Sequence, residues 1–164
     1  MAKSKSKEIS NVKGFFRLNV VDPDGTIRGD SGWKQNQITN SGYQQFLMYL
    51  LAGSAGSLRP SHAAFGTAGT PASADATLVN QLTETGAKPA LTTGTGGSKS
   101  VNYTFTLASG VVAAASTIMN VGLYYYTNAS QVNSNGTLMA GNTYASSSLA
   151  TNQAINGTYQ ISFG

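Results

Sequence analysis

The feature that most limits the possible folds is a two-residue alternation of apolar and polar side chains in short segments. It is clearest over residues 100–107, where the apolar positions are Val101, Tyr103, Phe105 and Leu107. Alternation with this period is typical of a β-strand with one buried face. The same alternation occurs at Phe16, Leu18 and Val20, and again at Tyr159, Ile161 and Phe163. The sequence therefore predicts a mainly β fold.

Turn-forming residues separate these segments. Asp22-Pro23-Asp24-Gly25 predicts a tight turn that returns the chain through residues 26–28, because proline presets φ and glycine accepts a positive φ. Further strands are expected at 117–127, apolar on both faces, and at 137–140 after Asn135-Gly136. The glycine-rich stretch 92–99 is interpreted as a flexible loop. Short strands of this kind favour an antiparallel β-sandwich, either jelly-roll or immunoglobulin-like.

One short amphipathic helix is expected over residues 41–52. Ser41 and Gln44 have the spacing of a capping box at its start. The apolar residues then recur on one helical face, at Tyr43, Phe46, Leu47, Leu50 and Leu51. Gly53 is a suitable C-cap.

The 164 residues divide into two predicted parts. Residues 1–13 form a basic N-terminal arm, because lysine alternates with serine there and no apolar periodicity appears. Residues 14–164 form a single β-sandwich domain, a length that folds around one core. The lysines of the arm are the candidate partner-docking residues: Lys3, Lys5, Lys7 and Lys13.

Charge is scarce and unevenly placed. Only 10% of the residues are charged, against about 25% in a typical soluble domain. Most of these charges precede residue 35, and no charged side chain follows Lys99. A surface of Ser, Thr, Asn and Gly requires little charge desolvation when copies pack together. We interpret the chain as one that self-associates, with a trimer as one expected form; the alternative is drift in a secreted-type β-protein.

Catalytic and metal sites are not predicted. The chain has no Cys, which removes thiol catalysis and zinc-thiolate sites. His62 is its one histidine, and no G-x-S-x-G motif provides a nucleophile for a triad with Asp75 or Glu84. A Ca²⁺ site at Asp22, Asp24 and Asp30 lacks the EF-hand spacing. We therefore expect a protein that is not an enzyme and has no cofactor.

The sequence bears differently on three other classes of partner. The apolar stretch 46–52 is far shorter than the roughly 20 residues that span a bilayer, so no membrane partner is expected. The arm lysines suit phosphate contacts, but the rest of the chain is nearly neutral, so nucleic acid is not favoured. A carbohydrate-binding module remains open, with Trp33 and the run Tyr124–Tyr126 as candidate aromatic platforms. Two-residue periodicity places at least one face of that run in the core.

Several short motifs resemble a family of small bacteriophage virion proteins, over roughly residues 36–164. Asn40-Ser41-Gly42-Tyr43 opens a leucine-rich segment that ends at Ala52-Gly53. The later motifs are Phe65-Gly66-Thr67-Ala68-Gly69-Thr70, Ala74-Asp75-Ala76-Thr77-Leu78 and Asn120-Val121-Gly122-Leu123-Tyr124. Proteins of this family serve as tail, fibre or head-decoration components, and the resemblance implies no catalytic residues.

These observations lead to one functional expectation and two alternatives. The leading expectation is a non-enzymatic capsid decoration (cement) protein that binds and stabilises the shell of major capsid protein. Its basic arm would lie across an acidic patch of that shell. It would reside in the virion, assembled in the bacterial host cytoplasm and not secreted. The alternatives are a tail or fibre-attachment adaptor and a carbohydrate-binding module.

Overall fold

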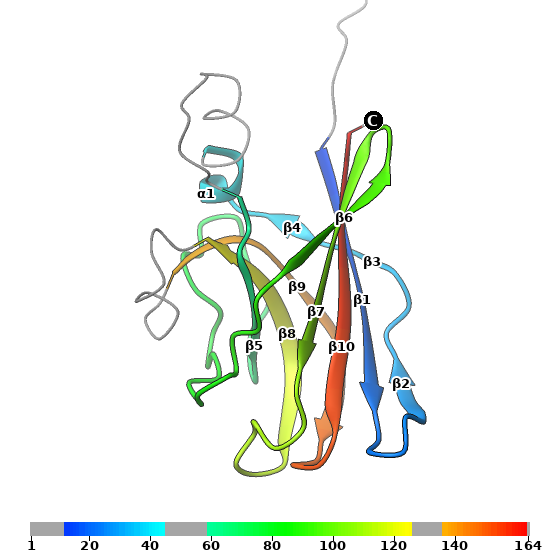
Figure 1. Cartoon of the computed structure of the whole chain (residues 1–164). Coiled ribbons are helices and arrows are strands. Elements are labelled where there is room, and N and C mark those ends of the chain that lie inside the picture. The colour runs from blue at the N-terminus through cyan, green and yellow to red at the C-terminus, as the bar shows by residue number, and fades with distance from the viewer. Residues whose placement is uncertain (1–11, 45–58, 126–135, 164) are drawn as a thin grey trace, which may run out of the picture.

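The computed structural model describes residues 12–44, 59–125 and 136–163, which form two antiparallel sheets (Figure 1). The sheets pack face to face around a shared apolar core. The predicted mainly β class and the β-sandwich architecture are confirmed.

The larger sheet, sheet A, contains both ends of the described chain. Its strands are β1 (Val12–Val21), β2 (Ile27–Asp30), β3 (Lys34–Gln35), β6 (Thr92–Gly97), β7 (Ser100–Leu107) and β10 (Ala154–Phe163). The order is β2-β1-β10-β7-β6, with β3 also paired to β1. β1 and β10 are direct neighbours, and Val12 lies opposite Phe163.

The smaller sheet, sheet B, is built mainly from the middle of the chain. Its strands are β4 (Gln37–Ile38), β5 (His62–Gly66), β8 (Ser116–Tyr125) and β9 (Thr137–Leu149). The order is β4-β9-β8-β5. The strand predicted over residues 137–140 therefore continues through Leu149.

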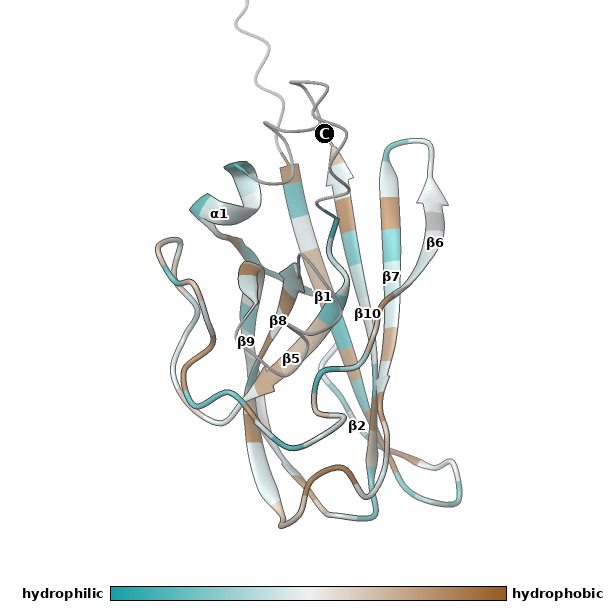
Figure 2. Ribbon diagram, turned by 60° about the vertical axis from the view of Figure 1, so that its left-hand side comes forward, coloured by the Kyte–Doolittle hydropathy of each residue, from teal (hydrophilic) through white to brown (hydrophobic). Residues whose placement is uncertain are grey.

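The core follows the predicted alternation in β1, β7 and β10, which Figure 2 shows as apolar and polar bands along these strands. Inward-facing residues form rows across sheet A, one of them Phe16, Tyr159 and Tyr103. The Phe16 and Tyr159 rings meet edge to face, 4.5 Å between centroids. Edge-to-face geometry of this kind adds to the stability gained by burial.

A second, smaller core forms on the other side of sheet B. Ala64, Leu78, Tyr124 and Leu138 pack together there, and the Leu78 amide donates to the Tyr124 hydroxyl at 2.7 Å. The segment that follows β5 thus contributes to a cover for this sheet. The prediction that residues 117–127 are apolar on both faces is confirmed for the described part of β8.

Strand β8 does not follow a strict two-residue alternation. The pairing with β9 is irregular between Ile118 and Asn120, and an irregularity of this type changes which residues share a face. Ile118 therefore joins Val121 and Leu123 in the main core, while Met119 is 38% exposed.

The helix starts earlier than predicted. α1 spans Asn40–Gly42, and its N-cap is Thr39, not Ser41. The buried Thr39 hydroxyl accepts from the Gly42 amide at 3.0 Å and donates to the Leu138 carbonyl at 2.7 Å. The remainder of the predicted helix, from residue 45, and its C-cap Gly53 lie outside the described residues.

The stretch 92–99 is a strand and turn, not the predicted loop. Residues of β6 pair with β7 from Thr92, opposite Thr104, to Gly97, opposite Ser100. Glycine lowers intrinsic strand propensity, so propensity alone hides this strand. Pairing with the strongly alternating β7 supplies the missing stabilisation.

The predicted turn at residues 22–25 is confirmed. The Gly25 amide donates to the Asp22 carbonyl at 2.9 Å, and Gly25 has φ of 87°. The Asp24 side chain accepts from the Thr26 amide at 2.9 Å. Both acids thus take part in the hairpin, as turn formation requires.

Candidate interaction surface

The structure places one of the four candidate arm lysines. Lys13 lies exposed in β1, opposite Ser162 of β10. It therefore belongs to the sandwich, and the predicted boundary of the arm moves back to residue 11. Lys3, Lys5 and Lys7 lie outside the described residues.

Two ion pairs neutralise the charges next to the first hairpin. Arg17 binds Asp30 through two contacts, Nε–Oδ1 at 3.1 Å and Nη2–Oδ2 at 2.5 Å. Arg28 binds Asp22, which also accepts from Gln153 Nε2 at 2.6 Å. The Gln153 hydrogen bond, followed by that from Arg28, lowers the pKa of Asp22. The carboxylates of Asp30 and Asp22 are therefore already paired with side chains of the same chain.

Four inner strands of the two sheets carry no charge. β7, β8, β9 and β10 all follow Lys99 in sequence, so none contains a charged residue. These strands occupy inner positions in the two sheets. On the outward face of sheet A, β7 and β10 present hydroxyl and amide groups, which are less costly to desolvate than ions.

The outward face of sheet A has ordered rows of polar side chains. Asn19, Asn156 and Thr106 lie opposite one another on β1, β10 and β7. Arg17, Thr158 and Thr104 form the next row along the same strands. Neighbouring strands lie about 4.8 Å apart, so each row presents polar groups at short, regular intervals.

These rows line an open groove of about 890 Å³, here called the Trp33 groove. Trp33 lies on the β1 side, and the Lys88-Pro89-Ala90 segment is also part of the lining. This volume falls within the range of small-molecule sites. The Trp33 groove is the candidate binding surface on the described part of the chain.

Trp33 is 50% exposed, and the chain beside it is held by hydrogen bonds to sheet A. The Ser31 amide donates to the Leu18 carbonyl at 2.9 Å, and the Leu18 amide donates to the Ser31 hydroxyl at 2.9 Å. Gly32 adopts φ of 61° and donates its amide to Asp30 at 2.9 Å. The indole is thus presented by an anchored segment.

The two described residues of the tyrosine run, Tyr124 and Tyr125, are not exposed. Tyr124 is fully buried, Tyr125 is partly buried, and Tyr126 lies outside the described residues. Of the aromatic candidates for sugar binding, the structure leaves Trp33 as the exposed one among the described residues. The sequence did not reveal its polar neighbours, because they come from three strands far apart in the chain.

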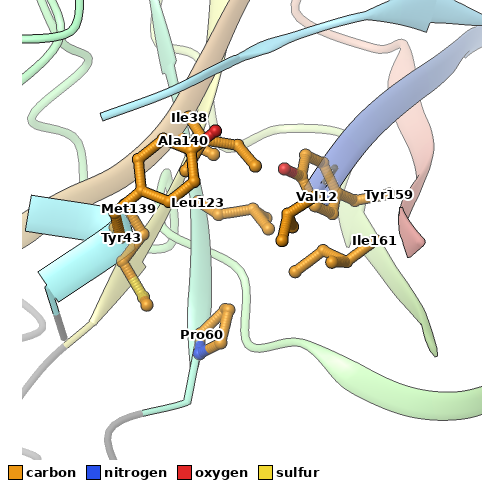
Figure 3. A pocket seen from close by; sticks show the side chains of 10 residues that line it. Val12, Ile38, Tyr43, Pro60, Leu123, Met139, Ala140, Tyr159 and Ile161 are labelled. Carbon is orange, nitrogen blue, oxygen red and sulfur yellow. The ribbon is translucent and has the colours of Figure 1, made fainter. Parts of the chain in front are cut away.

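A much smaller cavity lies beside α1. Its lining includes Tyr43, Leu123 and Ile161, and it encloses about 20 Å³ (Figure 3). That is close to the minimum for one water molecule, and an apolar cavity stays dry. We attribute it to imperfect packing between the sheets.

His62 lies on β5 beside a serine. Its Nδ1 is 3.0 Å from the hydroxyl of Ser61, which also donates to the Tyr124 carbonyl at 3.4 Å. Burial, and then the charge of Lys88, lower the pKa of His62. Because the Ser61 hydroxyl serves a backbone carbonyl, we do not assign this pair a nucleophilic role.

Three broader findings complete the description. Within residues 12–44, 59–125 and 136–163, no cluster of three metal-ligating side chains is found. In the same ranges, no helix has the length and apolar character needed to cross a membrane. Comparison with protein-family models, curated proteins and solved structures gives no match.

Proposed function

We propose that this chain is a non-enzymatic structural protein of a bacteriophage virion, and that it decorates the shell of major capsid protein. The observation that carries the proposal is the lack of charge on β7, β8, β9 and β10, four of the five inner strands of the two sheets; the fifth, β1, carries Lys13 and Arg17. Proteins packed densely on a shell bury part of their surface, and burying charge is costly unless it is paired. The phage-like motifs of the sequence point in the same direction.

The edge of sheet A offers a surface for self-association. Edge strands are normally protected by charge, shortness, irregularity or a covering segment. β2 carries Arg28 and Asp30, β4 has two residues, and β5 is bridged by Gln81 and Ala90. β6 has six residues without charge, and its irregularity lies at the turn end. A second copy is the proposed partner of this edge.

Replacing Thr93 by lysine tests this edge. Thr93 lies exposed on β6, opposite Tyr103, and a lysine there hinders pairing between identical edges. We expect Thr93→Lys to weaken self-association at least about tenfold, equivalent to about 1.4 kcal/mol. Analytical ultracentrifugation over a concentration series measures this. The matched control, Thr151→Lys in an exposed turn, should associate as the wild type does; equal association of both variants contradicts the β6 edge.

The arm provides the direct test of shell binding. β1 begins at Val12, which pairs with Phe163, so deleting residues 1–11 removes the arm while keeping the first strand. We expect the truncated protein to melt like the full chain but to lose attachment to capsids that lack decoration protein. Co-sedimentation with such capsids measures attachment; undiminished binding of the truncated protein contradicts the role of the arm.

Variants that remove or keep the positive charge of the arm separate the effect of its charge from the effect of its length. Changing Lys3, Lys5 and Lys7 together to Gln should weaken attachment, whereas changing them to Arg should preserve it. Binding of the wild type should also fall with rising salt, because exposed charges are screened within about 10 Å at 0.1 M. Binding that does not change with salt would contradict attachment through the charges of these lysines.

A tail or fibre-attachment adaptor is the second candidate within the virion. The same low-charge faces and the same edge suit a ring of copies. The two candidates differ in copy number, since a shell has many equivalent sites and a tail has few.

A further inference from the structure

The Trp33 groove combines an exposed aromatic ring with rows of hydroxyl and amide groups. Binding sites of this kind use an apolar surface for contact and a few placed polar groups for orientation. Sugars present both features, since their rings have apolar C–H faces and a rim of hydroxyls. We propose that the Trp33 groove binds a neutral oligosaccharide, with one ring stacked on the indole.

The polar rows supply the hydrogen-bonding part of the site. The Thr106 hydroxyl donates to Asn156 Oδ1 at 2.9 Å, which orients the amide and leaves its nitrogen as a donor. Thr104 and Thr158 lie in the adjacent row and line the same groove. Hydroxyl and amide groups both donate and accept, as the hydroxyls of a sugar require.

The charge in the groove favours a neutral ligand over an anionic one. Arg17 is held by two contacts to Asp30, so its charge is already balanced. In its satisfied orientation the Asn19 amide also donates to Asp30, at 3.1 Å. Lys88 is the other basic residue of the lining. Two basic residues, one of them already paired with Asp30, do not form the cluster of cations that a polyanion requires.

This inference stands apart from the role in the virion. It concerns a surface of the single chain and does not depend on the arm or on self-association, although its lining includes Thr92, the first residue of β6. A decoration or tail protein and a protein outside virions are equally able to carry such a groove. Its test therefore uses the isolated full-length protein.

Trp33 is the one tryptophan of the chain, so tryptophan emission reports on the groove alone. The probes are cellohexaose, maltohexaose and chitohexaose, preceded by an array of neutral and acidic glycans to choose further ones. We expect a saturable shift of the emission with at least one neutral oligosaccharide. No response to any neutral glycan, on the array or in titration, would overturn the proposal.

Variants locate the binding. By calorimetry, Trp33→Ala should weaken binding at least about tenfold, the equivalent of about 1.4 kcal/mol. Ile27→Ala removes another exposed apolar side chain, 59% exposed and outside the groove lining, and should leave binding unchanged. Equal effects of the two variants would overturn the assignment of the site.

A second pair of changes keeps the test valid if Trp33→Ala lowers the melting temperature. Thr104→Val with Thr106→Val preserves the shape of β7 and removes two hydroxyls from the groove. This double variant should bind less tightly while melting near the wild-type temperature. Binding confined to acidic glycans and lost in high salt would contradict a neutral ligand.

Discussion

Replacing Asn120 by aspartate should lower the free energy of unfolding by about 3–5 kcal/mol at neutral pH, the usual cost of an uncompensated buried charge. Asn120 is fully buried in β8. Its Nδ2 donates to the carbonyls of Ala68 and Gly69, the latter at 3.3 Å. A carboxylate at this position donates nothing and faces two carbonyl oxygens.

The pH dependence has a definite sign. Burial raises the pKa of a carboxyl group, so the introduced acid is protonated at low pH and its O–H then donates to a carbonyl. The stability of Asn120→Asp should therefore be highest in mild acid and be lost as pH rises through the raised pKa. Urea unfolding of the variant and the wild type between pH 4 and 8 measures the difference in their free energies of unfolding at each pH.

Asn142→Asp is the matched control. Asn142 lies on the neighbouring strand β9 and donates to the Gln35 carbonyl at 2.8 Å in an exposed setting. Water replaces this hydrogen bond, so its loss costs only about 0.5–1.5 kcal/mol. If the loss of unfolding free energy caused by Asn120→Asp is the same at every pH, the result contradicts a buried Asn120 side chain that donates to the Ala68 and Gly69 carbonyls.

Gly157→Ala should destabilise the sandwich by about 1–3 kcal/mol, the cost of overpacking a well-filled core. Gly157 lies between Leu18 and Phe105 on the inner face of sheet A. A methyl group there would collide with the ring of Phe105, which is itself packed edge to face against Phe65, 6.0 Å between centroids. The ring therefore has little room to move away.

A compensating change makes this prediction specific. Phe105→Leu removes the obstructing ring, so the double variant with Gly157→Ala should be more stable than the sum of the single effects predicts. Urea unfolding gives the interaction energy, which is about 0.5–3 kcal/mol for residues in contact. Gly29→Ala is the control, because its nearest neighbour would be 3.9 Å away. Additive effects would contradict the close packing.

The fold class could be predicted because local signals dominate it. Alternation in β1, β7 and β10, together with the turn at Asp22-Pro23-Asp24-Gly25, depends on neighbouring residues only. Strand β6 was missed because its glycines carry no strand signal, and its stability comes from pairing with β7. The irregularity in β8 was missed for a related reason, since only the pairing with β9 reveals it.

The candidate surface was predictable in part. Trp33 was singled out from sequence as a possible sugar platform, and it is half exposed beside a groove. Asn19, Thr106 and Asn156 were not singled out, because their proximity depends on the register of three strands. Thr39 was missed as the helix cap because the Ser41 and Gln44 spacing gave a competing local signal, and the burial of Thr39 against Leu138 of β9 depends on residues distant in sequence.

The proposed role in a virion is argued from composition and motifs. Low charge is compatible with a shell, a tail ring or another assembly, so the number of copies decides among them. In this proposal, the arm holds each copy to the shell and the β6 edge holds it to a neighbouring copy.

The most direct measurement of the central claim is the amount of this chain in purified particles, relative to the major capsid protein. Quantitative gel analysis or mass spectrometry gives this ratio. The proposal predicts a fixed stoichiometry of the same order as the capsid protein. A handful of copies would indicate a tail component instead, and absence from the particles, with the isolated protein monomeric at high concentration, would contradict the account.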